Sequence, residues 1–257
     1  LEAPGAIPDL AVLPESVFPV PINDLPVQAV QTLVDYVTDT QATLLFGAFI
    51  EEPRAHFYNS VIALTPDRPV QDYRKRHLVP FGEFIPWGFQ AFVDRMRIPI
   101  ADQQRGAAYQ APITVKDQRI ALNICYEDLF GAEIIQAWHQ NEQTPHLLLN
   151  VSNLAWFDDS IALDQHLQIS RMRALETARP MLRATNTGAT ALIDERGQVR
   201  ARLPYIDANH LDVTVQGQSG LTPYVRWGNG PALTLALGLL AITWARMRRQ
   251  ANRQHTP

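Results

Sequence analysis

The chain has 257 residues, of which 46% are hydrophobic and 19% charged, a balance typical of a packed globular protein and not of a disordered one. Its formal net charge of −4 gives no indication of nucleic-acid binding, because proteins of that class carry a strongly basic face. The single cysteine, Cys125, excludes an internal disulfide.

Short apolar runs alternate with helical patterns along most of the chain. The predicted elements are a strand at 9–13, an amphipathic helix at 27–37, a strand at 43–49, a hairpin of 58–64 and 70–75, a strand at 119–125, a helix at 131–140, a strand at 146–151, a helix at 165–179, a hairpin of 189–194 and 198–203, and a strand at 210–215. This mixture of alternating elements and hairpins predicts an α/β layered sandwich with mixed sheets.

The C-terminal tail differs from the rest, since residues 231–245 carry no charge. As a helix, the segment from Trp227 to Trp244 would span about 27 Å at about 1.5 Å per residue, close to the ~30 Å of a bilayer's hydrocarbon core. Four arginines follow at positions 246, 248, 249 and 253. They predict a membrane helix with a cytoplasmic C-terminus and the globular part on the opposite side. The alternative is a buried core helix, which the basic end disfavours.

Three polar residues stand where predicted strands end: Glu15, Lys75 and Cys125. A thiol must lose its proton to attack a carbonyl carbon, and a carboxylate can accept that proton. A lysine could stabilise the resulting oxyanion and favour the thiolate. Taken singly, each residue is better explained as a buried small hydrophobe, a loop carboxylate or a solvated strand residue. Together at three strand ends, they indicate a site on an α/β sandwich.

The segments around these residues resemble the nitrilase superfamily and, within it, the apolipoprotein N-acyltransferase family. The matching motifs are Pro14-Glu15-Ser16, Lys75-Arg76-His77-Leu78-Val79-Pro80-Phe81-Gly82-Glu83, Ile124-Cys125-Tyr126-Glu127, Val151-Ser152-Asn153 with Trp156-Phe157, Arg171–Glu176, Arg183–Gly188 and Gly220–Tyr224. The long lysine motif is the most specific of these, because a Glu, Lys and Cys set alone is common to all nitrilases. The resemblance runs from about residue 9 to the end of the chain.

This resemblance implies a nitrilase-like αββα sandwich over residues 1–222, a transmembrane helix over 223–248 and a basic cytoplasmic tail over 249–257. It also implies that the family's preceding transmembrane helices, and the opening strand and helix of the catalytic domain, are missing from this sequence. Glu15 matches the family's general base, Lys75 its oxyanion-stabilising lysine and Cys125 its acylated nucleophile.

Further positions match residues that the family has near the nucleophile. Glu83 and Glu127 match two acidic residues, and Tyr126 matches an aromatic residue beside the cysteine. Asn153 and Trp156 are expected to contact lipid or substrate. No metal or cofactor is implied.

An apolar arm follows the lysine motif and includes Phe81, Phe84 and Trp87. Gly82 and Pro86 favour a loop here, and exposed aromatic side chains on a loop suit a membrane surface. The functional interpretation is a mobile loop that touches lipid and admits acyl chains. Ordinary core packing explains the same residues equally well.

The activity implied by the resemblance is the final step of bacterial lipoprotein maturation. A phospholipid such as phosphatidylethanolamine would acylate Cys125, and the amine of an apolipoprotein's diacylglyceryl-cysteine would then take the acyl chain from the thioester, with ping-pong kinetics. We expect a monomer in the bacterial inner membrane, with its catalytic domain on the periplasmic side.

Other enzyme classes find less support in the sequence. Ser160, Asp164 and His166 suggest a serine hydrolase, but the sequence contains no Gly-x-Ser-x-Gly motif. It also lacks a His-Glu-x-x-His motif for a metal. Two alternatives stay open: a soluble carbon–nitrogen hydrolase of the same superfamily, and a membrane-tethered binding module without activity.

Overall fold

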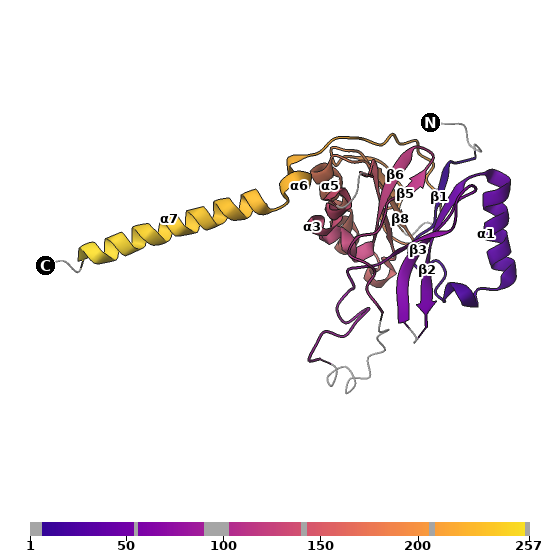
Figure 1. The fold of residues 1–257 in the computed structure, drawn as a ribbon, viewed down its shortest axis with the longest axis horizontal. Coiled ribbons are helices and arrows are strands. Elements are labelled where there is room, and N and C mark those ends of the chain that lie inside the picture. The colour runs from indigo at the N-terminus through magenta and orange to yellow at the C-terminus, as the bar shows by residue number, and fades with distance from the viewer. Residues whose placement is uncertain (1–6, 54–55, 90–102, 140–142, 206–208, 255–257) are drawn as a thin grey trace.

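The protein is an αββα sandwich in which two sheets pack face to face between layers of helices (Figure 1). A computed structural model describes residues 7–53, 56–89, 103–139, 143–205 and 209–254. The core between the sheets joins Leu45 and Val61 of the first sheet to Ile120 and Leu149 of the second. The predicted fold class is therefore confirmed.

The first sheet has the strand order β1 (Leu10–Val12), β2 (Thr43–Glu52), β3 (His56–Leu64) and β4 (Gln71–Arg74). The β1–β2 pair is parallel and the other two pairs are antiparallel. Helix α1 (Val27–Thr40) covers the outer face, where Val37 packs with Leu44 and Phe46. The helix η1 (Ile22–Asp24) lies in the connection before α1. This arrangement leaves the ends of β1 and β4 free to carry site residues.

The second sheet has the order β10 (Val199–Arg202), β9 (Ala191–Ile193), β8 (Met181–Thr185), β7 (Leu147–Ser152), β6 (Gln118–Ile124) and β5 (Ile113–Val115). The three central strands β6, β7 and β8 are parallel. Their outer face is covered by α3 (Gly131–Ile134), α4 (Gln136–His139) and α5 (Ile161–Thr177). The 3₁₀ helices η2 (Cys125–Leu129) and η3 (Ala155–Phe157) follow β6 and β7 directly. Residues after these two strands therefore meet at one edge of the sheet.

Several elements differ from the sequence prediction. The helix expected at 131–140 is divided at Ile135 into α3 and α4. The strand expected at 210–215 is wrong, because the segment is extended but pairs with no strand in the described structure, and only Val215 packs against the core. The strands β5 and β8 were not predicted. Each is short, and Arg183 interrupts the apolar pattern of β8.

The predicted C-terminal helix is two helices. α6 (Pro223–Trp227) ends at Gly228, which has a φ of 53°. It belongs to the globular part, because Val225 is buried in the core and Thr222 caps the helix while its hydroxyl donates to the Glu176 carbonyl. The globular part of the structure therefore includes α6.

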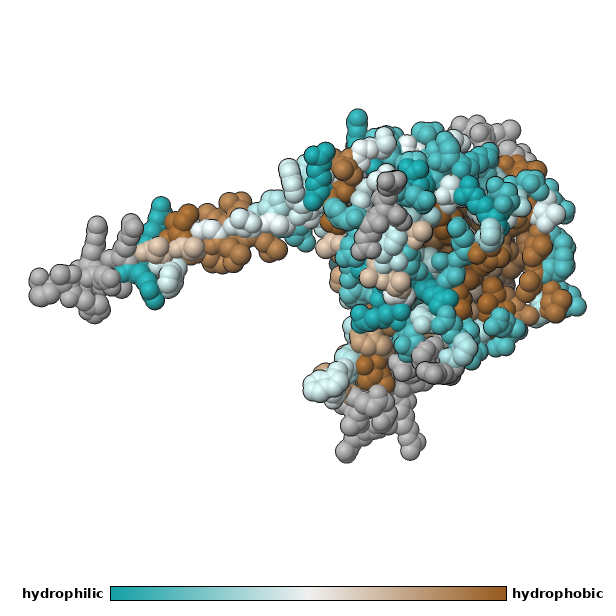
Figure 2. All heavy atoms as spheres, in the orientation of Figure 1, coloured by the Kyte–Doolittle hydropathy of each residue, from teal (hydrophilic) through white to brown (hydrophobic). Residues whose placement is uncertain are grey.

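Helix α7 (Gly230–Gln254) projects away from the sandwich (Figure 1). Its segment Gly230–Arg248 is long and apolar enough to cross a membrane, and none of it is buried within the described structure. Figure 2 shows the apolar side chains exposed along its length. At its basic end, the Arg248 guanidinium lies 3.9 Å from the centroid of the Trp244 ring. In this structure α7 is therefore not a buried core helix.

Gly47 in β2 allows the segment that carries Glu15 to lie against the sheet. A Cβ atom at position 47 would lie 2.6 Å from the Pro14 carbonyl oxygen and 2.7 Å from the Glu15 Cα. We predict that Gly47→Ala lowers the free energy of unfolding by about 1–3 kcal/mol, because backbone must move to accept the methyl group. Thermal denaturation measures the effect. Gly82→Ala is the control, since its nearest neighbour would lie 3.4 Å away, and equal melting temperatures for the two variants would contradict the prediction.

Candidate active site

The structure brings Glu15, Lys75 and Cys125 together where β1, β4 and β6 end. The Lys75 Nζ lies 3.2 Å from the Glu15 Oε1 and 2.7 Å from the Glu83 Oε1. Charges on Lys75 and Glu15 both act on the Cys125 thiol. Glu15 and Lys75 come from the first sheet and Cys125 from the second, so the site lies across the junction of the two sheets.

Glu15 is buried, and its carboxylate is held from several sides. Its Oε1 accepts hydrogen bonds from Lys75 Nζ and from Asn59 Nδ2, the latter at 2.7 Å. Its Oε2 accepts one from the backbone N–H of Asn153, also at 2.7 Å. Asn59 was not predicted as a site residue. The signal that could have found it is a polar residue in the middle of the apolar strand β3.

The Lys75 ammonium is 1% exposed and lies between two carboxylates. Burial by itself would lower the pKa of this group, but the negative charges of Glu15 and Glu83 and the hydrogen bond to Glu83 raise the pKa. Lys75 therefore stays protonated, as a donor to a developing oxyanion must. Glu83 also accepts hydrogen bonds from the backbone N–H of Val79 and from the Asn59 side chain. The segment from Lys75 to Glu83 is therefore folded so that its last residue contacts its first.

Cys125 is partly exposed and has a left-handed backbone, with a φ of 51°. Such a conformation is uncommon and costly for a residue with a Cβ, and it persists where the surroundings impose it. The residue lies where β6 passes into η2, and its carbonyl oxygen accepts a hydrogen bond of 3.2 Å from the Asn150 side chain. Cys125 therefore stands at a sharp turn at the end of β6.

The electrostatic environment keeps the thiol protonated. Burial raises the pKa of Cys125 most, the negative charge of Glu15 raises it further, and Lys75 lowers it. Lys75 lowers the pKa of the thiol, as expected, but the net shift of that pKa is upward. A resting thiolate is therefore disfavoured, and attack on a carbonyl needs a base in place when the substrate arrives.

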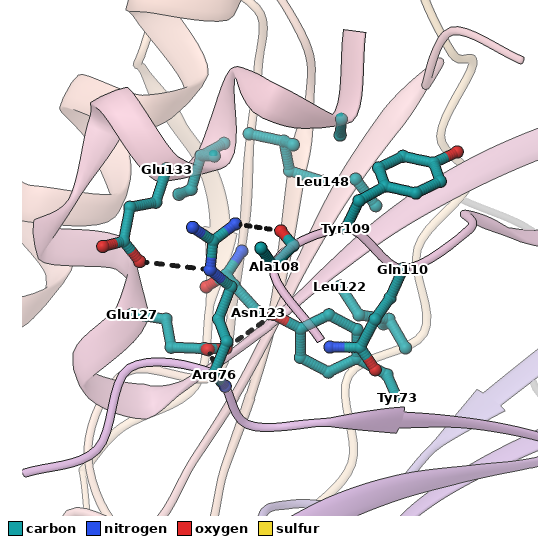
Figure 3. A pocket seen from close by; sticks show the side chains of 13 residues that line it. Tyr73, Arg76, Ala108, Tyr109, Gln110, Leu122, Asn123, Glu127, Glu133 and Leu148 are labelled. Carbon is teal, nitrogen blue, oxygen red and sulfur yellow. Dashed lines mark hydrogen bonds and ion pairs between the residues drawn. The ribbon is translucent and has the colours of Figure 1, made fainter. Parts of the chain in front are cut away.

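Glu127 joins the end of β6 to the end of β4. Its Oε1 accepts hydrogen bonds from the backbone N–H groups of Arg76 and His77, and its Oε2 accepts from the Ile124 N–H and the Tyr73 hydroxyl. Figure 3 shows this carboxylate beneath Arg76 and beside Tyr73. Because Lys75 precedes Arg76 and Cys125 follows Ile124, this one side chain fixes the spacing of the two segments.

An aromatic cluster of His77, Tyr126 and Phe130 lies beside the turn that carries Cys125. His77 stacks on Phe130 with ring centroids 3.6 Å apart, and Tyr126 meets both rings edge-on. The His77 Nδ1 lies 3.0 Å from a Glu133 carboxylate oxygen. Tyr126, next to Cys125 in the chain, is thus held in an aromatic cluster.

The expected lipid-contacting residues differ in exposure. Trp87 is 99% and Trp156 88% exposed, so neither packs in a core. Phe81 is exposed and lies edge-on to the ring of Phe89, while the Arg105 guanidinium lies 5.0 Å from the centroid of the half-buried Phe84 ring.

Asn153 reaches the site through its backbone N–H only. Its side-chain oxygen instead accepts hydrogen bonds from the Ala155 N–H and the Asn186 amide, which orders the turn that follows β7.

The set Ser160, Asp164 and His166 does not converge. Ser160 caps α5, Asp164 contacts Tyr205 and Arg202 at the surface, and His166 lies in the interior against Arg183.

A cavity of about 50 Å³ lies beside Glu127 (Figure 3). Its lining includes Arg76, Asn123, Glu127 and Glu133, and does not include Cys125. The Arg76 guanidinium in it is bonded to Glu133 and to the Ala108 carbonyl. A water molecule needs about 10–15 Å³ of such cavity volume, so the cavity holds a few waters and is too small for an acyl chain.

An αββα sandwich with a glutamate, a lysine and a cysteine at its strand ends has the architecture of a nitrilase-type protein. The carbon–nitrogen hydrolase family matches residues 6–221, and the chain belongs to this family. A Xanthomonas campestris protein of the CN-hydrolase superfamily has the same fold, with a TM-score of 0.54 and 21% identity over 76% of this chain and 73% of that one.

Curated relatives show much higher identity. A Ralstonia nicotianae protein named apolipoprotein N-acyltransferase is 51% identical over 93% of this chain. A Bordetella bronchiseptica protein with the same name is 46% identical, also over 93% of the chain. In each case the match covers 46% of the relative, so the chain spans about half the length of the curated relatives it matches.

Neutralising Glu127 should loosen the site. A glutamine side chain has one acceptor oxygen in place of two. In Glu127→Gln an –NH₂ group therefore faces donors that have a carboxylate oxygen as acceptor in the parent protein. We predict a loss of about 2–4 kcal/mol in the free energy of unfolding, measured by chemical denaturation. Glu133→Gln is the control, because that carboxylate is partly exposed and its loss should cost under about 1 kcal/mol. Equal losses in both variants would contradict the role of Glu127.

The raised pKa of Cys125 predicts unusual thiol reactivity. Because the chain has one cysteine, alkylation by iodoacetamide reports this group alone. An ordinary thiol has its midpoint at about pH 8.5 and levels off about one to two pH units above it, whereas the rate for Cys125 should still be rising there. Glu15→Gln removes a negative charge that raises the pKa, so this variant should react faster at neutral pH. Asp67→Asn, an exposed control on the hairpin turn, should leave the profile unchanged, and a plateau near the ordinary value in the parent protein would refute the shift.

Proposed function

We propose that this chain is the catalytic part of an apolipoprotein N-acyltransferase that moves an acyl chain from a phospholipid to the amine of a diacylglyceryl-cysteine. The observation that carries the proposal is the placement of Cys125, a partly exposed residue whose thiol is acted on by the charges of the Glu15 carboxylate and the buried Lys75 ammonium. The identity with relatives of that name supports the same activity. The thiol is the nucleophile, Glu15 the base and Lys75 the oxyanion donor.

In the first half-reaction, Glu15 accepts the thiol proton as the sulfur attacks the ester carbonyl carbon of the phospholipid. The carbonyl oxygen becomes an oxyanion, to which the Lys75 ammonium donates a hydrogen bond. The ester C–O bond then breaks, and the departing lysophospholipid oxygen takes the proton from Glu15. A thioester remains on Cys125.

In the second half-reaction, the amine of the apolipoprotein attacks the thioester carbon. Glu15 accepts a proton from the attacking nitrogen, and Lys75 again donates to the oxyanion. When the C–S bond breaks, an amide is released and the sulfur recovers its proton from Glu15. Because the thiol is protonated at rest, one carboxylate serves both halves in turn. The kinetics are ping-pong, since the donor product leaves before the acceptor binds.

A membrane setting accompanies this proposal. α7 is apolar and unburied, and we infer that it crosses the bacterial inner membrane with its basic end in the cytoplasm. The sandwich then lies on the periplasmic side as a monomer. Trp87, Trp156 and Phe81 are exposed, and on a membrane-bound enzyme these side chains would contact lipid and guide acyl chains.

Mass spectrometry of the full-length protein in mixed micelles with phosphatidylethanolamine tests the acyl-enzyme. We expect one acyl mass on Cys125, lost when a diacylglyceryl-cysteine peptide is added, with the acyl group recovered on the peptide amine. Cys125→Ala should carry no acyl mass. Glu15→Gln and Lys75→Ala should load acyl groups at least about 100-fold more slowly, the usual scale of a lost base or oxyanion donor.

The same experiment separates the alternatives. A carbon–nitrogen hydrolase would release free fatty acid without peptide acylation, and a non-catalytic binding module would gain no acyl mass. Acyl loading that persists in Cys125→Ala would refute the thioester. Arg68→Ala serves as the matched surface control for Lys75→Ala and should load acyl groups at the parent rate.

A further inference from the structure

A cluster of buried polar groups lies behind Cys125, and the proposed reaction leaves it unused. It consists of Asp128 from η2, His166 and Ser170 from α5, and Arg183 from β8, all of them buried. The Asp128 Oδ2 accepts a hydrogen bond of 2.5 Å from the Ser170 hydroxyl and lies 3.3 Å from the Arg183 Nη1. A buried charge of this kind is costly unless its partners are held in place, so the cluster needs a reason beyond packing.

The contacts fix the protonation state of His166. A guanidinium has only donors, so the His166 Nδ1, which lies 2.9 Å from the Arg183 Nη2, is an acceptor. Burial first, and then the charge of Arg183, lower the pKa of His166 to about 3. The ring is therefore neutral, with its proton on Nε2. That N–H faces the Asp128 Oδ1 at 3.6 Å, an oxygen with no closer hydrogen-bond partner among the described residues.

Two members of this cluster, Asp128 and His166, lie close to the turn that carries Cys125. Asp128 is three residues from Cys125 in the same 3₁₀ helix, and the His166 ring interacts with the Cys125 backbone. Arg183 is anchored by its Nε, which donates to the Ala189 carbonyl. The turn with a left-handed Cys125 is thus tied to α5 and β8 through one carboxylate.

The charge of Asp128 acts on the thiol as well. It raises the pKa of Cys125, in the same direction as Glu15 and Glu83 and against Lys75. The groups that face Asp128 itself are Arg183 from β8, His166, Ser170 and Arg173 from α5, and Glu127 from η2. Burial raises the pKa of Asp128 to about 6 in spite of the two arginines and the serine. The carboxylate is therefore charged at neutral pH.

We propose that Asp128 is a positioning residue for Cys125: held by α5 and β8, its buried carboxylate fixes the left-handed turn that presents the thiol and keeps that thiol protonated until Glu15 removes the proton. The inference rests on the proposed role of Cys125 as the nucleophile. In this arrangement Glu15 removes the proton from the Cys125 thiol, and Asp128 keeps the thiol protonated and in position before the substrate binds.

Alkylation of the single thiol by iodoacetamide tests this directly and needs no lipid substrate. Asp128→Asn removes a negative charge and leaves Arg183 uncompensated, so the midpoint of the alkylation profile should fall by about one pH unit. At neutral pH the thiolate fraction would rise about tenfold, and its lower nucleophilicity would reduce the gain in rate to about threefold. Asp164→Asn, the same change on the exposed side of α5, should match the parent protein.

A second pair of variants tests the geometry if Asp128→Asn fails to fold, as judged by thermal unfolding. His166→Leu removes the N–H that faces Asp128 and should slow alkylation about tenfold at every pH, since misplacing a reacting group by about 1 Å is costly. His166→Gln can still accept from Arg183 and donate toward Asp128, and should restore the parent rate. A parent-like profile in a folded Asp128→Asn, or equal rates in both His166 variants, would overturn the proposal.

These outcomes stand apart from those of the acyl-transfer experiment. If the alkylation profile of Asp128→Asn shifts as expected while phospholipid adds no acyl mass to Cys125, the role of Asp128 at the thiol holds and the proposed activity fails. If acyl loading succeeds while the alkylation profile is unmoved by Asp128→Asn, the activity holds and the positioning role fails.

Discussion

The buried Lys75 ammonium is the interaction on which the rest of the site depends. A cation with almost no exposure is stable only if anions and hydrogen-bond acceptors surround it. Here Glu15 and Glu83 supply them, and they come from two loops that would otherwise have no reason to meet. Asn59 then bridges the two carboxylates. The need to neutralise one charge therefore assembles the half of the site that belongs to the first sheet.

The second sheet contributes to the site the strained turn at Cys125, where the first sheet contributes charged side chains. Cys125 is held in a left-handed conformation by contacts on both sides of it, with Glu127 bonded to Ile124 before it and Asn150 bonded to its own carbonyl. Glu127 also reaches across to Arg76 and His77. Because one carboxylate bonds to both segments, it links the backbone next to Lys75 with the backbone next to Cys125.

Charge around the thiol has a consequence for chemistry. Glu15, Glu83 and Asp128 all oppose ionisation of Cys125, and Lys75 alone of the stronger influences favours it. A protonated thiol is less open to oxidation and to stray electrophiles than a thiolate. An enzyme facing the periplasm, as we propose, would gain from a nucleophile that forms only when a substrate carbonyl and the base are both in place.

The sequence by itself determined the fold class, because apolar periodicity and turn residues are local signals, and the motif of nine residues from Lys75 to Glu83 resembles one family. It also placed Glu15, Lys75 and Cys125 at strand ends. Local signals misassigned residues 210–215, whose alternating pattern finds no strand to pair with, and missed β8, where Arg183 breaks the pattern. Only the tertiary structure decided that Asn59 and Asp128 hold the site and which groups Glu127 bonds to, since each acts on residues distant in the sequence or through burial. The upward shift in the thiol pKa was likewise beyond the sequence, because burial and the summed field of charges from both sheets exist only in the folded chain.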